Sequence, residues 1–311
     1  MAKKPEVLVA VDFTDTDAAL LDAASDFARR IGAAVRAVHV TLPPPALPAS
    51  TVSPEVQGAL KAWAARLNAH REAVAARLDV CTKGLASRGV EAHATLVEGR
   101  PREALVAAAS APEVVAVVLG PHAARDSAGG RLLERLIGST GSYVVRHAPC
   151  PVLVVEKGMR LVSTPPLWVV GVDLSEHSAR VFKAAAGLAA RAGARVLAAY
   201  VYAPVGPVEN GGEAWQDVLR RFAQQEAEGE LRAWLSSIGA AEAAPNTESA
   251  VIVGDPAGAL EALAHERGAE LLLVGTHGRG AAGRFVLGSV AEKCLRVSRV
   301  PMLVLPNGVE A

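Results

Sequence analysis

Short apolar runs alternate with longer helix-like patterns along the whole chain. The runs are rich in Val, Leu and Ala, and segments with apolar residues at helical spacing follow them. This alternation is typical of β-α-β units, in which helices cover both faces of a parallel sheet. We predict five strands and four helices in each half. The predicted strands are Val7–Val11, Val35–Val40, Ala92–Val97, Val114–Leu119 and Val152–Val155, then Trp168–Val172, Arg195–Val201, Ala250–Val253, Leu271–Val274 and Met302–Leu305.

Two helical stripes stand out by their length. Their apolar residues recur at steps of three and four, which forms one face of an amphipathic helix. Such a face normally docks on a sheet, so we expect both stripes to belong to the core, and a partner-binding face is the alternative. The stripes are Val56, Leu60, Trp63, Leu67, Val74 and Leu78, and then Trp215, Val218, Leu219, Phe222, Leu231, Trp234 and Ile238.

The two halves repeat the same motifs in the same order, which indicates a tandem duplication. A charged, serine- and proline-containing stretch at 156–166 separates the copies. We therefore predict two doubly wound, Rossmann-like α/β domains, residues 1–158 and 165–311. The matched motifs are Asp12 with Asp173, Gly99–Pro101 with Gly254–Pro256, Gly138-Ser139 with Gly288-Ser289, and Pro151–Val155 with Pro301–Leu305.

Composition narrows the classes of function. The 311 residues are 51% hydrophobic, which is enough for two cores. Lys plus Arg and Asp plus Glu number 32 each, so the balanced charge does not suggest a nucleic-acid partner. No apolar run approaches the roughly 20 residues of a membrane span. The cysteines Cys81, Cys150 and Cys294 lack metal-site spacing and indicate reduced thiols. We expect a cytoplasmic protein without a nucleic-acid or membrane partner.

The segment Leu271–Ser289 carries the strongest chemical signal. A strand leads into a glycine-rich loop, and a helix then begins at the Gly-Ser pair. Backbone N–H groups and the positive end of the helix dipole make such a helix start an anion site. We therefore predict that Gly275, Gly278, Gly288 and Ser289 hold the phosphates of a nucleotide.

Asp173 is expected to face the same crevice as this loop. Ligands of doubly wound sheets bind beyond the carboxyl ends of the strands, where the strand order reverses. Asp173 ends the first strand of the second half, so its carboxylate can accept a hydrogen bond from a ribose hydroxyl or an adenine amine. The alternative is that Asp173 caps the following helix, a role that Ser175 can also take.

Other readings of the loop fit less well. The stretch Gly278–Gly283 reads GxGxxG, but it lies in the fourth βα turn and lacks the acidic residue of a dinucleotide site. A P-loop would need a lysine before Ser289, and none is present. Arg284 is better placed than Arg279 to reach a phosphate. His122 and His277 are interpreted as solvated loop side chains, and we predict no catalytic residue and no metal ligand.

Together these motifs resemble the universal stress protein family over nearly the whole chain, as two copies. They are G-x2-G-x9-G-S after the fourth strand, an Asp ending the first strand, Gly-x-Pro before the third helix and a closing PVLVV strand. The resemblance implies a five-stranded parallel sheet in the order 3-2-1-4-5 in each half. It also implies ATP, with Mg²⁺ as an optional companion, and Val201 packing on the adenine. The implied ATP-binding residues are Asp173, Val201, Gly275, Gly278, Gly288, Ser289 and Val290.

The first half departs from this pattern. Ala123 replaces the second glycine of the loop, Pro121 removes a backbone donor, and the spacing from Gly120 to Gly138 is longer. We predict that this half binds ATP weakly or not at all.

The resemblance implies an ATP-binding stress-response or regulatory protein whose nucleotide state modulates contacts with an unidentified protein partner. The alternatives are a slow ATP-hydrolysing or nucleotidyl-transferring enzyme and an interaction scaffold without a nucleotide. Family dimers resemble pairs joined along their last strands. Val152–Val155 and Met302–Leu305 are therefore expected to pair antiparallel, as an intramolecular pseudo-dimer, and a further homodimer stays open.

Overall fold

The computed structural model describes residues 3–14, 17–43, 54–120, 132–156, 158–161, 163–202, 213–277, 287–306 and 308. In the first half the elements are β1 (Glu6–Ala10), α1 (Asp17–Ile31), β2 (Ala34–Thr41), α2 (Pro54–Ser87), β3 (Ala92–Glu98), α3 (Pro101–Ala109), β4 (Val114–Leu119), α4 (Leu132–His147) and β5 (Val152–Val154). In the second half they are β6 (Leu167–Val172), α5 (Glu176–Ala192), β7 (Arg195–Tyr202), α6 (Glu213–Ser237), α7 (Ala240–Ala243), β8 (Thr247–Val253), α8 (Pro256–Glu266), β9 (Leu271–Gly275), α9 (Ser289–Val297) and β10 (Met302–Leu305).

Every predicted strand is present, and the bounds differ mostly by a single residue. The largest difference is at β8, which begins at Thr247 instead of Ala250. The prediction of four helices per half is wrong for the second half, because the described residues include the one-turn helix α7. Gly239 has a φ of 68° and separates α7 from the end of α6. A residue in the left-handed conformation commonly ends a helix, and glycine adopts this conformation without steric cost.

All ten strands form one sheet in the order β3-β2-β1-β4-β5-β10-β9-β6-β7-β8. Each half therefore has the expected order 3-2-1-4-5, and the strands within each half are parallel. The halves join where β5 and β10 pair antiparallel, with Leu153 opposite Leu303. This pairing confirms the expected contact between the last strands. It also leaves neither of these strands as an exposed edge.

Helices cover both faces of the sheet and bury one apolar cluster on each face. The first cluster holds Phe27 of α1, Leu78 of α2 and Phe182 of α5. The second holds Leu105 of α3 and Leu260 of α8. The strands carry side chains alternately to the two faces, and each cluster contains residues from both halves because one sheet runs through both. The chain is thus two doubly wound α/β units that share a continuous sheet.

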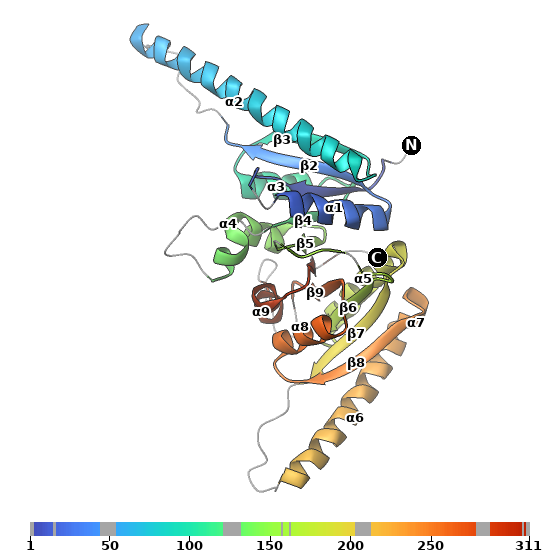
Figure 1. Cartoon of the computed structure of the whole chain (residues 1–311). Coiled ribbons are helices and arrows are strands. Elements are labelled where there is room, and N and C mark those ends of the chain that lie inside the picture. The colour runs from blue at the N-terminus through green and yellow to red at the C-terminus, as the bar shows by residue number, and fades with distance from the viewer. Residues whose placement is uncertain are drawn as a thin grey trace.

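The long helices pack over only part of their length, so the prediction for the two stripes is partly wrong. Val74 and Leu78 of α2 are buried, but Val56 and Trp63 are 48% and 37% exposed. Phe222 of α6 is also exposed, whereas Leu231 is buried. Helix α2 has 34 residues, or about 50 Å, while β3 spans about 23 Å. Its first half therefore projects past the sheet, as α6 also does (Figure 1). The side chains of Trp215, Val218 and Leu219 lie outside the described residues.

Candidate functional site

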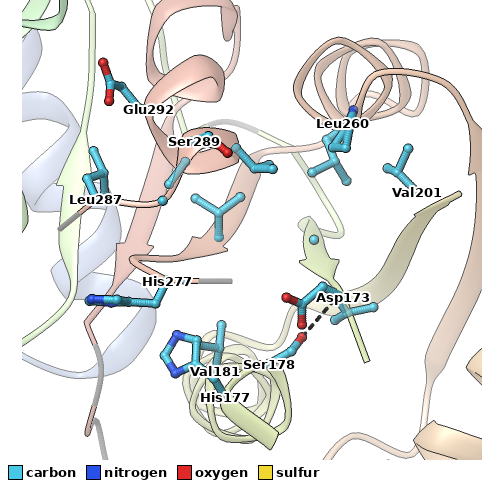
Figure 2. Close-up of a pocket in the computed structure, with 18 residues that line it drawn as sticks. Asp173, His177, Ser178, Val181, Val201, Leu260, His277, Leu287, Ser289 and Glu292 are labelled. Carbon is cyan, nitrogen blue, oxygen red and sulfur yellow. Dashed lines mark hydrogen bonds between the residues drawn. The ribbon is translucent and has the colours of Figure 1, made fainter. Parts of the chain in front are cut away.

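A cavity of about 630 Å³ opens at the carboxyl ends of β6 and β9. These strands are neighbours, and the chain order reverses between them, since β7 lies beyond β6 and β10 lies beyond β9. The crossovers from the two strands leave toward opposite faces, which opens a crevice at this point of a doubly wound sheet. Figure 2 shows the side chains that line it.

The predicted site residues that the structure describes all line this cavity. They come from the ends of β6, β7 and β9 and from the start of α9. Gly278 and Arg284 lie outside the described residues. The lining residues among those predicted are Asp173, Val201, Gly275, Gly288, Ser289 and Val290.

Asp173 lies at the mouth of the crevice and is held there by the following turn. Its Oδ1 accepts hydrogen bonds from the N–H and the hydroxyl of Ser175, at 3.1 and 2.6 Å. Ser175 in turn accepts from the N–H of Ser178 and is the N-cap of α5. The alternative role of Asp173 as the helix cap is therefore wrong. The Asp173 N–H also donates to the Ser178 hydroxyl at 3.1 Å (Figure 2). These bonds fix the position of the carboxylate.

Gly275 ends β9 where there is no room for a side chain. A Cβ at this position would lie 2.9 Å from Val181 Cγ2 and 3.0 Å from His177 Nε2. Glycine therefore lets α5 approach the end of the strand and keeps this wall of the cavity clear.

The start of α9 lines the end of the cavity that offers backbone N–H groups as hydrogen-bond donors. Gly288 is the N-cap with an extended backbone, and its own N–H donates to the Thr276 carbonyl at 2.7 Å. The N–H groups in the first turn of a helix have no intrahelical acceptor. Those of Ser289 and Val290 belong to that turn, beside the positive end of the helix dipole. This arrangement suits an anionic group.

The opposite end of the cavity is apolar. Val201 at the end of β7 and Leu260 of α8 lie together there, away from Ser289 and His277 (Figure 2). Gly171 lets Leu260 pack against β6, because a Cβ on this glycine would lie 2.8 Å from Leu260 Cδ1. The cavity thus runs from an apolar wall, past a carboxylate, to a helix N-terminus.

Several lining residues are absent from the sequence prediction. His177 and Ser178 follow Asp173 on α5, and Glu292 lies one turn into α9. The Glu292 carboxylate forms an ion pair with Arg296. Ser178 could have been found, because the helical spacing after Asp173 places it near the strand end. No sequence signal marks His177 as a site residue.

His277 also differs from its interpretation as a solvated side chain. It is half-buried, lines the cavity and lies with its ring centroid 5.9 Å from that of His177, at an interplanar angle of 83°. Its Nδ1 is 2.9 Å from the Thr276 hydroxyl. His122 lies outside the described residues.

Within the described part of the chain, no group of three or more His, Cys, Asp or Glu side chains is arranged to hold a metal ion. Among the same residues, no helix is both long and apolar enough to span a membrane.

Comparison with known proteins gives a consistent family assignment. The model of the universal stress protein family matches residues 5–156 and again residues 169–306. Universal stress protein Rv2005c of Mycobacterium tuberculosis (strain ATCC 25618 / H37Rv) is 32% identical over 222 residues, which cover 70% of this chain and 70% of that protein. Universal stress protein Rv1996 of the same strain is 32% identical over 196 residues, covering 62% of this chain and 59% of that protein.

Solved structures share the whole fold. The crystal structure of a universal stress protein from Archaeoglobus fulgidus DSM 4304 matches with a TM-score of 0.66 and 18% identity, covering 97% of this chain and 96% of that chain. A putative universal stress protein from Pseudomonas aeruginosa UCBPP-PA14 matches with a TM-score of 0.56 and 14% identity, covering 97% and 93%. At these identities the likeness shows a common architecture. The repeated motifs, the repeated sheet order and the double match of the family model together make this chain a tandem member of the universal stress protein family.

Proposed function

We propose that this chain is a stress-response protein whose second half binds ATP, and that the nucleotide state of this half modulates contacts with a protein partner. The observation that carries the proposal is the cavity of about 630 Å³ in which Asp173, Val201 and Ser289 line one continuous surface. Its volume lies within the range of roughly 300–1,000 Å³ that is usual for small-molecule sites.

The chemistry along the cavity matches the parts of ATP in order. The adenine fits the apolar wall at Val201 and Leu260, and the ribose hydroxyls can donate to Asp173. The phosphates then meet the N–H groups and the hydroxyl at the start of α9. Gly288 itself carries no side chain that would keep the triphosphate away from the backbone. Mg²⁺ accompanying the phosphates would be held chiefly by phosphate oxygens and water.

Binding without efficient hydrolysis is the function that fits these side chains best. General-base catalysis needs a group that is available to take a proton from water. Glu292 is the carboxylate nearest the start of α9 among the described lining residues, and its ion pair with Arg296 occupies it. Slow hydrolysis in the same site is the second candidate.

The proposal is tested by isothermal titration calorimetry of the full chain with ATP. We expect binding that Val201→Trp abolishes, because the indole fills the adenine end. Asp173→Ala removes the proposed ribose acceptor and should weaken ATP binding. Its control is Asp12→Ala in the first half, which should leave ATP affinity unchanged. Absence of ATP binding to the wild type would refute the proposal. Incubation with ATP and Mg²⁺, followed by chromatography, shows whether ADP or AMP accumulates.

A further inference from the structure

The first half contains a second cavity, of about 160 Å³, at the equivalent place in its own sheet. It opens at the carboxyl ends of β1 and β4, which are neighbours at the first reversal of strand order. Many of its lining positions are matched by lining positions of the larger cavity through the repeat. The matched pairs include Ala10 with Gly171, Val11 with Val172, Asp12 with Asp173, Val40 with Val201, Pro101 with Pro256, Leu105 with Leu260, Leu119 with Val274 and Gly120 with Gly275.

The phosphate end, in contrast, is only partly matched in the described lining of this cavity. Thr140 and Gly141 line it, as the equivalent Val290 and Ala291 line the larger cavity, but Gly138 and Ser139, which correspond to Gly288 and Ser289, do not. The backbone conformation of this glycine differs between the two halves. Helix α4 begins at Leu132, and Gly138 lies at a kink inside it with φ 71° and ψ 166°. This non-helical glycine divides α4 into two helical segments, the second of which begins after it, whereas Gly288 precedes α9 with φ −61° and ψ 147°.

The charges at this end of the first half also disfavour a phosphate. Asp17 occupies the position that Ser178 holds in the second half, and its Oδ2 accepts from the N–H of Phe13 at 2.7 Å. Its carboxylate thus lies beside Asp12 at the strand end. Burial, together with the charge of Asp12, raises the pKa of Asp17 to about 6. At neutral pH the Asp12 carboxylate lines the cavity and the buried Asp17 carboxylate lies beside it, and both charges repel a phosphate.

The first-half cavity also has less room than the second-half cavity. Leu20 takes the place of Val181, and its Cδ1 would lie 2.9 Å from a Cβ at Gly120. The larger side chain fills the region next to the end of β4. The remaining volume of about 160 Å³ falls below the usual range of roughly 300–1,000 Å³ for complete small-molecule sites. It suits a flat, base-sized group.

What remains is an apolar slot with a few polar groups. Val40 and Leu105 line it, with the Asp12 carboxylate as an acceptor at one side. His39 adds an imidazole that is fixed by the 2.7 Å contact of its Nδ1 with the Val11 carbonyl. A planar heterocycle with an N–H donor, and without a negative charge, satisfies these groups.

We propose that the first half binds an uncharged purine, as the free base or as a nucleoside whose sugar lies at the mouth, and rejects the nucleotide. The inference rests on the proposed function, because the part of the small cavity that would hold the base is identified by its match to the adenine end of the large cavity. The two halves then sense different ligands within one continuous sheet.

Calorimetric stoichiometry of the full chain with adenosine and with ATP tests this inference. Wild type should bind ATP at a single site and adenosine at two. Val40→Trp should remove one adenosine site and leave ATP affinity within twofold of wild type. Val201→Trp should remove ATP binding and keep one adenosine site. Ala10→Leu narrows the small cavity from the neighbouring strand and should give the same result as Val40→Trp, with unfolding temperatures checking that both variants are folded.

The outcomes separate the two proposals. If ATP binds to the wild type but Val201→Trp binds no adenosine, the first-half site is wrong and the proposed function stands. Equal affinity of ATP and adenosine at the site that Val40→Trp removes would also overturn it. If no ATP binds, but adenosine binding is lost in Val40→Trp and in Ala10→Leu, the proposed function fails and the first-half site stands.

Discussion

Arg30 and Glu270 form an ion pair that ties the first half to the second across 240 residues of sequence. The Arg30 Nη2 lies 2.5 Å from Glu270 Oε1, and the Glu270 side chain is fully buried. The other carboxylate oxygen accepts from Trp168 Nε1 at 3.2 Å. Both Trp168 and Glu270 lie at the amino ends of the strands whose carboxyl ends form the large cavity. The halves are thus held together on the side away from the site.

Glu270→Ala should destabilise the protein by about 2–4 kcal/mol, because it leaves Arg30 and the Trp168 N–H without this acceptor. Denaturation by urea measures the loss. Glu248→Ala removes an exposed partner of Arg195 and Arg267, and should cost less than about 1 kcal/mol. Replacing both members, as in Arg30→Met with Glu270→Leu, should recover part of the loss. Equal effects of Glu270→Ala and Glu248→Ala would contradict this account of the ion pair.

Trp63→Ala should change stability by less than about 1 kcal/mol, although Trp63 lies on the same stripe as Leu78. Trp63 is 37% exposed on the projecting part of α2, whereas Leu78 is buried. Leu78→Ala leaves a cavity in the core and should cost about 2–5 kcal/mol. Thermal unfolding followed by circular dichroism compares the two variants. A large loss for Trp63→Ala would show that the projecting segment is packed in solution.

Gly288→Ala should lower ATP affinity more than tenfold while the protein stays folded. The φ of Gly288 is −61°, so alanine meets no backbone strain there. Its methyl group would stand where the phosphates approach, and each lost hydrogen bond to a charged phosphate is worth about 1.5–3 kcal/mol. Gly187→Ala is the matched control, since a Cβ at this helical position meets nothing within 4 Å. It should leave ATP affinity unchanged and raise stability slightly. Wild-type affinity in Gly288→Ala would remove the phosphate site from this helix start.

Asp17→Asn should change the pH dependence of stability between about pH 4 and pH 6. The pKa of Asp17 is raised from 3.8 to about 6, chiefly by burial, so the folded state binds this proton more tightly than the unfolded state. Its contribution to stability is therefore full below about pH 4 and is lost as the pH rises through 6. An asparagine cannot ionise, so the variant should gain stability relative to wild type as the pH rises. Unfolding temperatures across this range measure the difference, and a constant difference at every pH would contradict the prediction.

Local pattern determined a large part of this molecule. The strands at Val114–Leu119 and Met302–Leu305 are where the apolar runs predicted them, because a buried parallel strand needs a continuous apolar run. The repeat identified equivalent positions, and the amino-acid pattern indicated that Asp173 and Ser289 belong to one crevice. That assignment also needed the family resemblance, which implied the strand order that makes β6 and β9 neighbours.

Tertiary structure decided what periodicity does not encode. The stripe from Val56 to Leu78 shows that one face of a helix is apolar, but the length of the sheet beneath it determines how much of that face is buried. His177 joins the site only because α5 packs against the end of β9 at Gly275. The kink at Gly138 and the ion pair of Arg30 with Glu270 depend on contacts between distant segments. The sequence therefore specified the elements and the chemistry at their ends, while packing decided which of these groups meet.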